Sequence, residues 1–251
     1  MIIIHRFMSI SSKLDQLHAE ARGNKWLRYF ATFLRLALAL GFVAGGITKI
    51  MGERFASGLS VNHPMGQYLE ALHHTGFYYP FIGWVQVLAA ILLLVPRTIL
   101  LGALLYFPVI LNICILSYAV RFEGSILTSP LMVLGCLFLI CWNYDKIKYL
   151  LPFKHGNVPG PLPQQKIYSN KFPVKFFSGV AATVIAVVLF ISFGFGVMPR
   201  NSLKDCAAQF VGTNRTKAGA EFCNCIHNQG QPLNSCINAY KKAPDDIVRI
   251  K

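Results

Sequence analysis

The chain has 251 residues, of which 54% are hydrophobic and only 14% are charged. A mean hydropathy of +0.48 is too high for one water-soluble core, so the composition indicates an integral membrane protein. The net charge of +14 does not indicate nucleic-acid binding, because the basic residues concentrate beside the apolar segments and in the C-terminal tail.

The first 28 residues predict an amphipathic helix on the cytoplasmic membrane surface. Leu14, Leu17 and Ala21 share one side of this helix, and charged residues occupy the other. Residues 1–7 are too short an apolar run for a cleavable signal peptide, so we expect internal segments to direct membrane insertion.

Five apolar segments each approach the roughly 20 residues that a helix needs to cross a bilayer. They are residues 29–51, 78–95, 99–120, 127–142 and 176–197. Lysine and arginine concentrate before the first segment and between the fourth and fifth, which predicts a cytoplasmic N-terminus. Five crossings then place the C-terminus on the extracytoplasmic side.

Polar residues interrupt these apolar segments at Arg35, Lys49, Gln86 and Asn112. A buried cation in the membrane is costly, so Arg35 is expected to reach the head groups, a partner or a ligand. One hypothesis is a ligand held by Arg35, with hydrogen bonds from Gln86 and Asn112. The alternative is that the two amides only join helices. Lys49 lies near the outer end of its helix and is interpreted as an interface anchor.

Two glycines on the first segment predict where a neighbouring helix packs. Gly41 and Gly45 are four residues apart, a spacing that lets two helix backbones approach closely. Such an approach would turn the face that carries Arg35 toward the interior of the bundle.

The loop between the first two segments predicts a short helix. Asn62 or His63 can cap its start, Pro64 suits the first turn, and Gly76 can end it. We expect this helix to lie on the extracytoplasmic membrane surface.

The water-facing side of this short helix is predicted to carry His63, Glu70 and His74, with His73 beside them. Imidazoles and a carboxylate can bind a divalent metal or respond to pH, so Glu70, His73 and His74 are a candidate metal site. The alternative is a solvated face without a ligand.

Four features between residues 26 and 150 occur in a fixed order. Arg35 is followed by a glycine-rich stretch ending at Lys49, by IGWVQVLAAILLLVPR at residues 82–97, and by LGALL at 101–105. This order resembles the DoxX family of small four-helix bacterial membrane proteins. The resemblance implies a four-helix bundle in the bacterial inner membrane. No cofactor is evident from the sequence, and the resemblance leaves a quinone as one option, since the family's name comes from a quinone-linked enzyme but its functions are broad. Members often have glutamate where Gln86 stands.

Four prolines at positions 152, 159, 161 and 163 predict a cytoplasmic linker. The chain therefore divides into residues 1–28, the bundle 29–151, the linker 152–175, a fifth membrane helix 176–198 and an extracytoplasmic domain 199–251. The predicted fold is an all-α membrane protein.

Four cysteines in the tail, Cys206, Cys223, Cys225 and Cys236, predict two disulfides in a small helical domain. Turns at residues 212–214 and 229–232 place Cys206 opposite Cys223 and Cys225 opposite Cys236. The alternative is a metal or thiol-exchange site at Cys223-x-Cys225.

Two functions remain open at this point. One is an accessory or scaffold subunit whose extracytoplasmic domain binds a protein partner. The other is a quinone-binding subunit of a redox system, which would need a partner to supply electrons because the sequence holds no haem, flavin or iron–sulfur motif. A small-molecule transporter is a weaker alternative, and we do not expect an enzyme acting alone.

Overall fold

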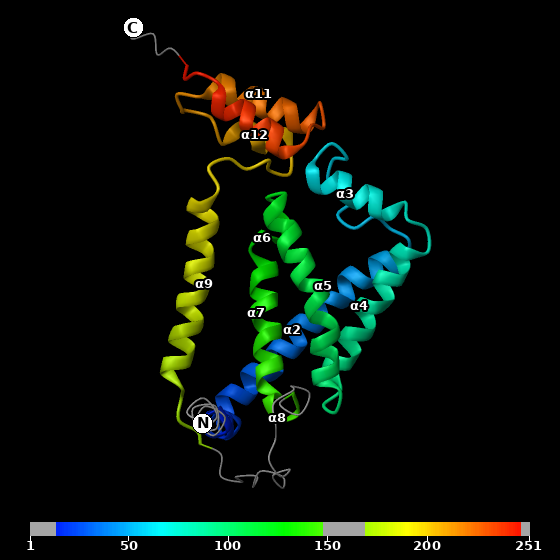
Figure 1. Cartoon of the computed structure of the whole chain (residues 1–251), viewed down its shortest axis with the longest axis vertical. Helices are drawn as coiled ribbons and strands as arrows, with labels where there is room; N and C mark the ends of the chain where they lie inside the picture. The colour runs from blue at the N-terminus through cyan, green and yellow to red at the C-terminus, as the bar shows by residue number, and fades with distance from the viewer. Residues whose placement is uncertain (1–13, 148–168, 247–251) are drawn as a thin grey trace, which may run out of the picture.

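The structure, a computed structural model, describes residues 14–147 and 169–246, and helices dominate both ranges (Figure 1). The long apolar helices are α2 (Lys25–Ile50), α4 (Tyr78–Leu94), α5 (Ile99–Ala119), α7 (Thr128–Trp142) and α9 (Val174–Gly194). Each overlaps one of the five predicted segments, and the largest differences are at α2, which begins at Lys25 and not at residue 29, and at α9, which ends at Gly194 and not at residue 197.

Four spans in the described residues are long and apolar enough to cross a membrane, and α6 (Glu123–Ile126) together with α7 forms one of them. The short helix α3 (Pro64–His73) and α4 meet at an angle of 99°, and as one bent span they make the fifth. His63 caps α3 by accepting a hydrogen bond from the Met65 N–H, as one of the two predicted caps.

Helices α2, α4, α5 and α7 pack together around a hydrophobic core. Small residues of α4 and α5, Ala89, Ala90 and Ala103, are fully buried there and let the helices approach closely. The rings of Phe42 on α2 and Tyr106 on α5 stack with centroids 3.4 Å apart. Both rings are buried in the core between α2 and α5.

Helices α2 and α4 approach each other closely at Gly46 and Gly83. A Cβ atom at Gly83 would lie 2.6 Å from the backbone oxygen of Gly46, so a larger residue does not fit. The prediction that Gly41 and Gly45 form this contact is wrong: both line an internal cavity instead. Because glycines occupy positions 41, 45 and 46, the spacing alone could not identify the contacting one.

Residues 14–22 are helical and lie at the end of the bundle opposite α3 (Figure 1). Arg22 forms an ion pair with Asp145 of α8 (Tyr144–Ile147) at 3.1 Å. Leu14 and Leu17 are exposed, in keeping with a helix at a surface. Residues 1–13 of the predicted N-terminal segment lie outside the described residues.

Helix α9 stands beside the bundle and buries none of its own residues (Figure 1). At one end, Trp26 packs edge-on against Phe172 with ring centroids 5.4 Å apart. At the other end, Tyr118 of α5 lies 6.1 Å from the ring of Phe190. Most of the predicted linker before α9, residues 152–168, lies outside the described residues.

Three short helices form the C-terminal domain: α10 (Leu203–Ala208), α11 (Thr216–His227) and α12 (Leu233–Lys242). The structure holds both predicted disulfides, Cys206–Cys223 between α10 and α11 and Cys225–Cys236 between α11 and α12. Neither Cys223 nor Cys225 is therefore a free thiol. The disulfides enclose a small core built on Phe222.

Candidate functional site

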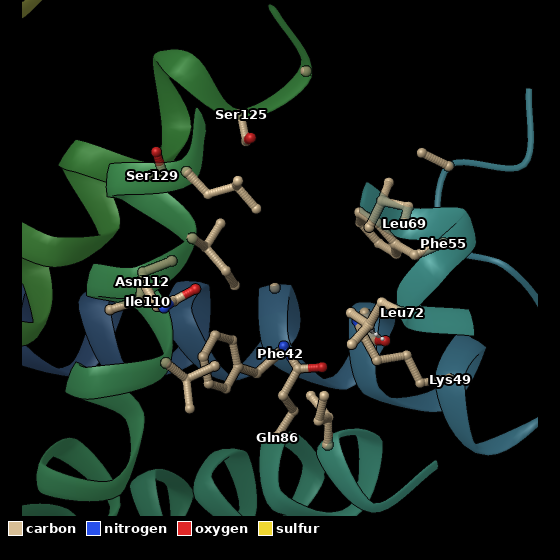
Figure 2. A pocket seen from close by; sticks show the side chains of 18 of the residues that line it. Phe42, Lys49, Phe55, Leu69, Leu72, Gln86, Ile110, Asn112, Ser125 and Ser129 are labelled. Carbon is tan, nitrogen blue, oxygen red and sulfur yellow. Dashed lines mark hydrogen bonds between the residues drawn. The ribbon is translucent and has the colours of Figure 1, made fainter. Parts of the chain in front are cut away.

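A cavity of about 780 Å³ lies among α2, α3, α4, α5 and α7 (Figure 2). In this view, α2 and α4 form its floor, α5 and α7 one wall, and α3 the opposite wall. Its lining is mostly apolar and includes Phe42, Phe55, Leu69, Leu72, Ile110, Ile113, Leu116 and Met132. A cavity of this size and character can hold a small organic molecule.

Lys49 supplies the cation of this cavity. Its side chain is only 7% exposed, and its ammonium donates a hydrogen bond to the Gly45 carbonyl at 2.9 Å. The same nitrogen lies 4.6 Å from the centre of the Phe55 ring, a cation–π contact. Within the described residues the ammonium has no carboxylate partner. Lys49 is thus a buried cation, and its interpretation as an interface anchor is wrong.

Two buried polar groups in the lining have a hydrogen-bonding atom without a partner. Gln86 of α4 is 3% exposed, and its Oε1 makes no hydrogen bond within the described residues. The same holds for the Oγ of buried Ser129 on α7. Since a buried polar atom without a hydrogen bond is costly, these atoms favour a polar molecule in the cavity.

The cavity has an open side. Asn112 of α5, Tyr68 of α3 and Tyr78 of α4 all line the cavity and are exposed at the protein surface. From their exposure we infer that the cavity opens at these residues, with a mouth between α5 on one side and α3 with α4 on the other. Gln86 and Asn112, predicted together as ligand-binding residues, do share the cavity.

Arg35 does not join them. Its guanidinium donates hydrogen bonds to the backbone oxygens of Leu93 at 2.8 Å and Leu94 at 2.6 Å, the last residues of α4. A cation at this position offsets the partial negative charge of a helix C-terminus and satisfies carbonyls that the helix leaves free. Arg35 is therefore a cap for α4, and its assignment to the ligand site is wrong.

The predicted metal site at Glu70, His73 and His74 is also wrong. No group of three metal-binding side chains occurs in residues 14–147 and 169–246. Glu70 instead pairs with Arg54 at 3.3 Å and with His74 at 3.0 Å. The ring of His73 packs edge-on against Tyr79 at 5.2 Å.

The C-terminal domain lies next to α3 (Figure 1), whose residues form one wall of the cavity. Asn62, just before α3, donates a hydrogen bond to the His227 carbonyl at 2.9 Å. Gln67 of α3 donates one to the Gly230 carbonyl at 2.7 Å. Nearby, Arg200 forms an ion pair with Glu123 of α6. The disulfide domain is thus docked on α3 and α6 of its own chain.

His63 lies under this contact and not on a water-facing surface as predicted. Its side chain is fully buried, and its ring lies 6.1 Å from Phe122 and 6.0 Å from His227. Burial, reinforced by the neighbouring His227 imidazole, lowers the pKa of His63 to about 4. His63 is therefore neutral at physiological pH.

These observations define a mostly helical protein whose apolar helices could span a membrane and enclose a largely apolar cavity. The chain belongs to the same family as the uncharacterized protein YwoB of Bacillus subtilis (strain 168). The two are 35% identical over 136 residues, which cover 49% of this chain and 81% of YwoB. No family model and no solved structure matches the chain.

Proposed function

We propose that this chain is an integral membrane protein that binds a lipid-like molecule in the cavity between α3 and α5. The proposal rests on one observation: an apolar cavity contains a buried cation, Lys49, and the unpaired oxygens of Gln86 and Ser129. Lys49 and the Ser129 hydroxyl would lose part of their burial cost on contact with a head group that accepts hydrogen bonds, and Gln86 Oε1 would do so on contact with a donor.

The mouth beside Asn112 lies partway along the apolar helix α5, so it would open sideways into the bilayer. A ligand dissolved in the membrane could enter there without passing through water. The resemblance to the DoxX family, which covers residues 26–150, makes a quinone one member of this ligand class. We further propose a bacterial inner-membrane location with the C-terminal domain outside, which the distribution of basic residues supports.

Cavity occlusion tests this function. A Cβ atom at Gly45 would lie at ordinary contact distances from Lys49, Phe55 and Gln86, and Gly45 lines the cavity, so we expect the ring of Gly45→Trp to occupy cavity space. Gly179 on α9 has open space around it, and Gly179→Trp is the matched control. Lipids and quinones that copurify with each variant are extracted and quantified by mass spectrometry.

We expect Gly45→Trp to lower the amount of one copurifying compound per protein, whereas Gly179→Trp retains the wild-type amount. Equal amounts of every copurifying compound in the wild type and Gly45→Trp would contradict the proposal.

An accessory role is a second proposal, supported by α9. None of its residues is buried, although its apolar length suits a membrane span. A helix with a free surface could pack against a helix of a partner subunit. Replacement of residues 178–192 by leucine should then remove a protein that copurifies with the wild type; retention of that protein would argue against a role for α9.

A further inference from the structure

We infer that the cavity selects ligands with an acidic head group, a carboxylate or a phosphate, on an apolar chain. This inference rests on the proposed function and names the class of ligand. An acidic ligand differs from a neutral quinone, which offers carbonyl oxygens but carries no charge.

The first reason for an acidic ligand is the charge of Lys49. Its ammonium has one hydrogen bond, to Gly45, and one ring contact, to Phe55, and it has no carboxylate partner in residues 14–147 and 169–246. An ammonium has three donors, so two remain for a ligand. A buried cation without a counter-ion is strongly disfavoured, and an anionic ligand would offset that cost most directly.

The second reason is the open space beside Gly45, which lies close to two nitrogen donors. A Cβ atom there would lie 3.7 Å from the Nζ of Lys49 and 3.9 Å from the Nε2 of Gln86. Two nitrogen donors from α2 and α4 therefore converge on the space that the missing side chain leaves open. Carboxylate and phosphate groups have several acceptor oxygens and can accept from both donors at once.

The rest of the lining suits the chain of such a ligand. Away from Lys49 the cavity is bordered by Ile110 of α5 (Figure 2). Ile113 of α5 and Met132 of α7 also belong to the apolar lining. It continues to the mouth at Asn112 and Tyr68. An acyl chain could therefore extend from a head group at Gly45 toward the bilayer, which keeps its apolar carbons out of water.

A pair of probes that differ only in charge tests the inference. Full-length protein in nanodiscs of neutral lipid is titrated with a fluorescent polyene fatty acid and with its methyl ester, and the signal of empty nanodiscs is subtracted. We expect the acid to bind about tenfold more tightly than the ester, the ratio typical of a hydrogen bond to a charged group. Competition with a phosphatidic acid and with an unlabelled fatty acid then distinguishes phosphate from carboxylate.

Lys49→Met removes the charge and keeps the length of the side chain. We expect this variant to bind acid and ester equally, and Lys49→Arg to retain a preference for the acid. Lys175, in the first turn of α9, provides the matched control Lys175→Met, which should behave as the wild type. The comparison of acid with ester in the wild type needs no variant and decides the question even if Lys49→Met fails to fold.

Equal binding of acid and ester by the wild type would overturn the inference. In that case ester binding lost in Gly45→Trp would still support the cavity as a site for neutral ligands. If neither probe binds and Gly45→Trp changes no copurifying compound, the proposed function itself fails. The two failures are thus distinguishable.

Discussion

The imidazole rings of His63 and His227 lie 6.0 Å apart, although 164 positions separate the residues in the chain. His63 begins α3, a wall of the cavity, and His227 ends α11 of the disulfide domain. The ring of His227 also contacts the Pro199 carbonyl at 2.7 Å. The two histidines therefore join the cavity wall to the domain that covers it.

Acid should weaken this contact. The pKa of His63 is about 4 in the docked state and about 6.5 when the ring is exposed, so the undocked state binds more protons between these values. Docking is then fully favourable above about pH 6.5 and loses on the order of 1 kcal/mol per pH unit as the pH falls toward 4. Spin labels at Thr75, after α3, and Lys241, in α12, are both exposed and measure the distance between α3 and the C-terminal domain as the pH is lowered.

His63→Asn keeps a side-chain acceptor for the Met65 N–H but cannot titrate. We expect its label distances to be independent of pH between 4 and 6.5. His74→Asn alters an exposed histidine and serves as the control. A pH response that is unchanged in His63→Asn would show that His63 is not the group whose titration weakens the contact.

We expect Arg35 to contribute to the stability of the fold and Lys49 to contribute to ligand binding. Arg35→Met removes two charge-assisted hydrogen bonds to the end of α4, so we expect it to lower the free energy of unfolding by about 1.5 to 3 kcal/mol. It should leave ligand binding in the folded protein unchanged, because Arg35 does not line the cavity. Thermal unfolding in detergent and titration with the fatty-acid probe measure the two effects. Lost binding in stable Arg35→Met would contradict this assignment.

Helix bounds could be predicted well from the sequence because they depend on local signals. The apolar length of α5 and the proline at the start of α3 act within a few residues. The roles of Arg35 and Lys49 could not be predicted in this way. Both lie on the glycine-bearing face of α2. Their different surroundings depend on how α2 packs along α4, which places Arg35 at the C-terminal end of α4 and Lys49 in the cavity.

The packing of α2 along α4 depends on the Gly46 and Gly83 contact, which should be sensitive to a single methyl group. In Gly83→Ala the new Cβ meets the backbone of α2, which cannot rotate away as a side chain could. We expect a loss of about 1 to 3 kcal/mol in the free energy of unfolding, the usual cost of overpacking. Gly179→Ala, which adds a methyl group in open space, is the control. Equal melting temperatures for the two variants would show that α4 can shift freely.

We expect the two disulfides to be required for the C-terminal domain to stay docked on α3. Cys206–Cys223 and Cys225–Cys236 link cysteines 17 and 11 positions apart, and a disulfide that closes a loop of about 15 residues typically contributes about 3 kcal/mol. The core around Phe222 is small, so we expect reduction to unfold residues 199–246 and release α3. Hydrogen exchange in the full-length protein should then rise in α11, α12 and α3 but not in α5. Protection of α3 that survives reduction would mean that the bundle alone holds this wall.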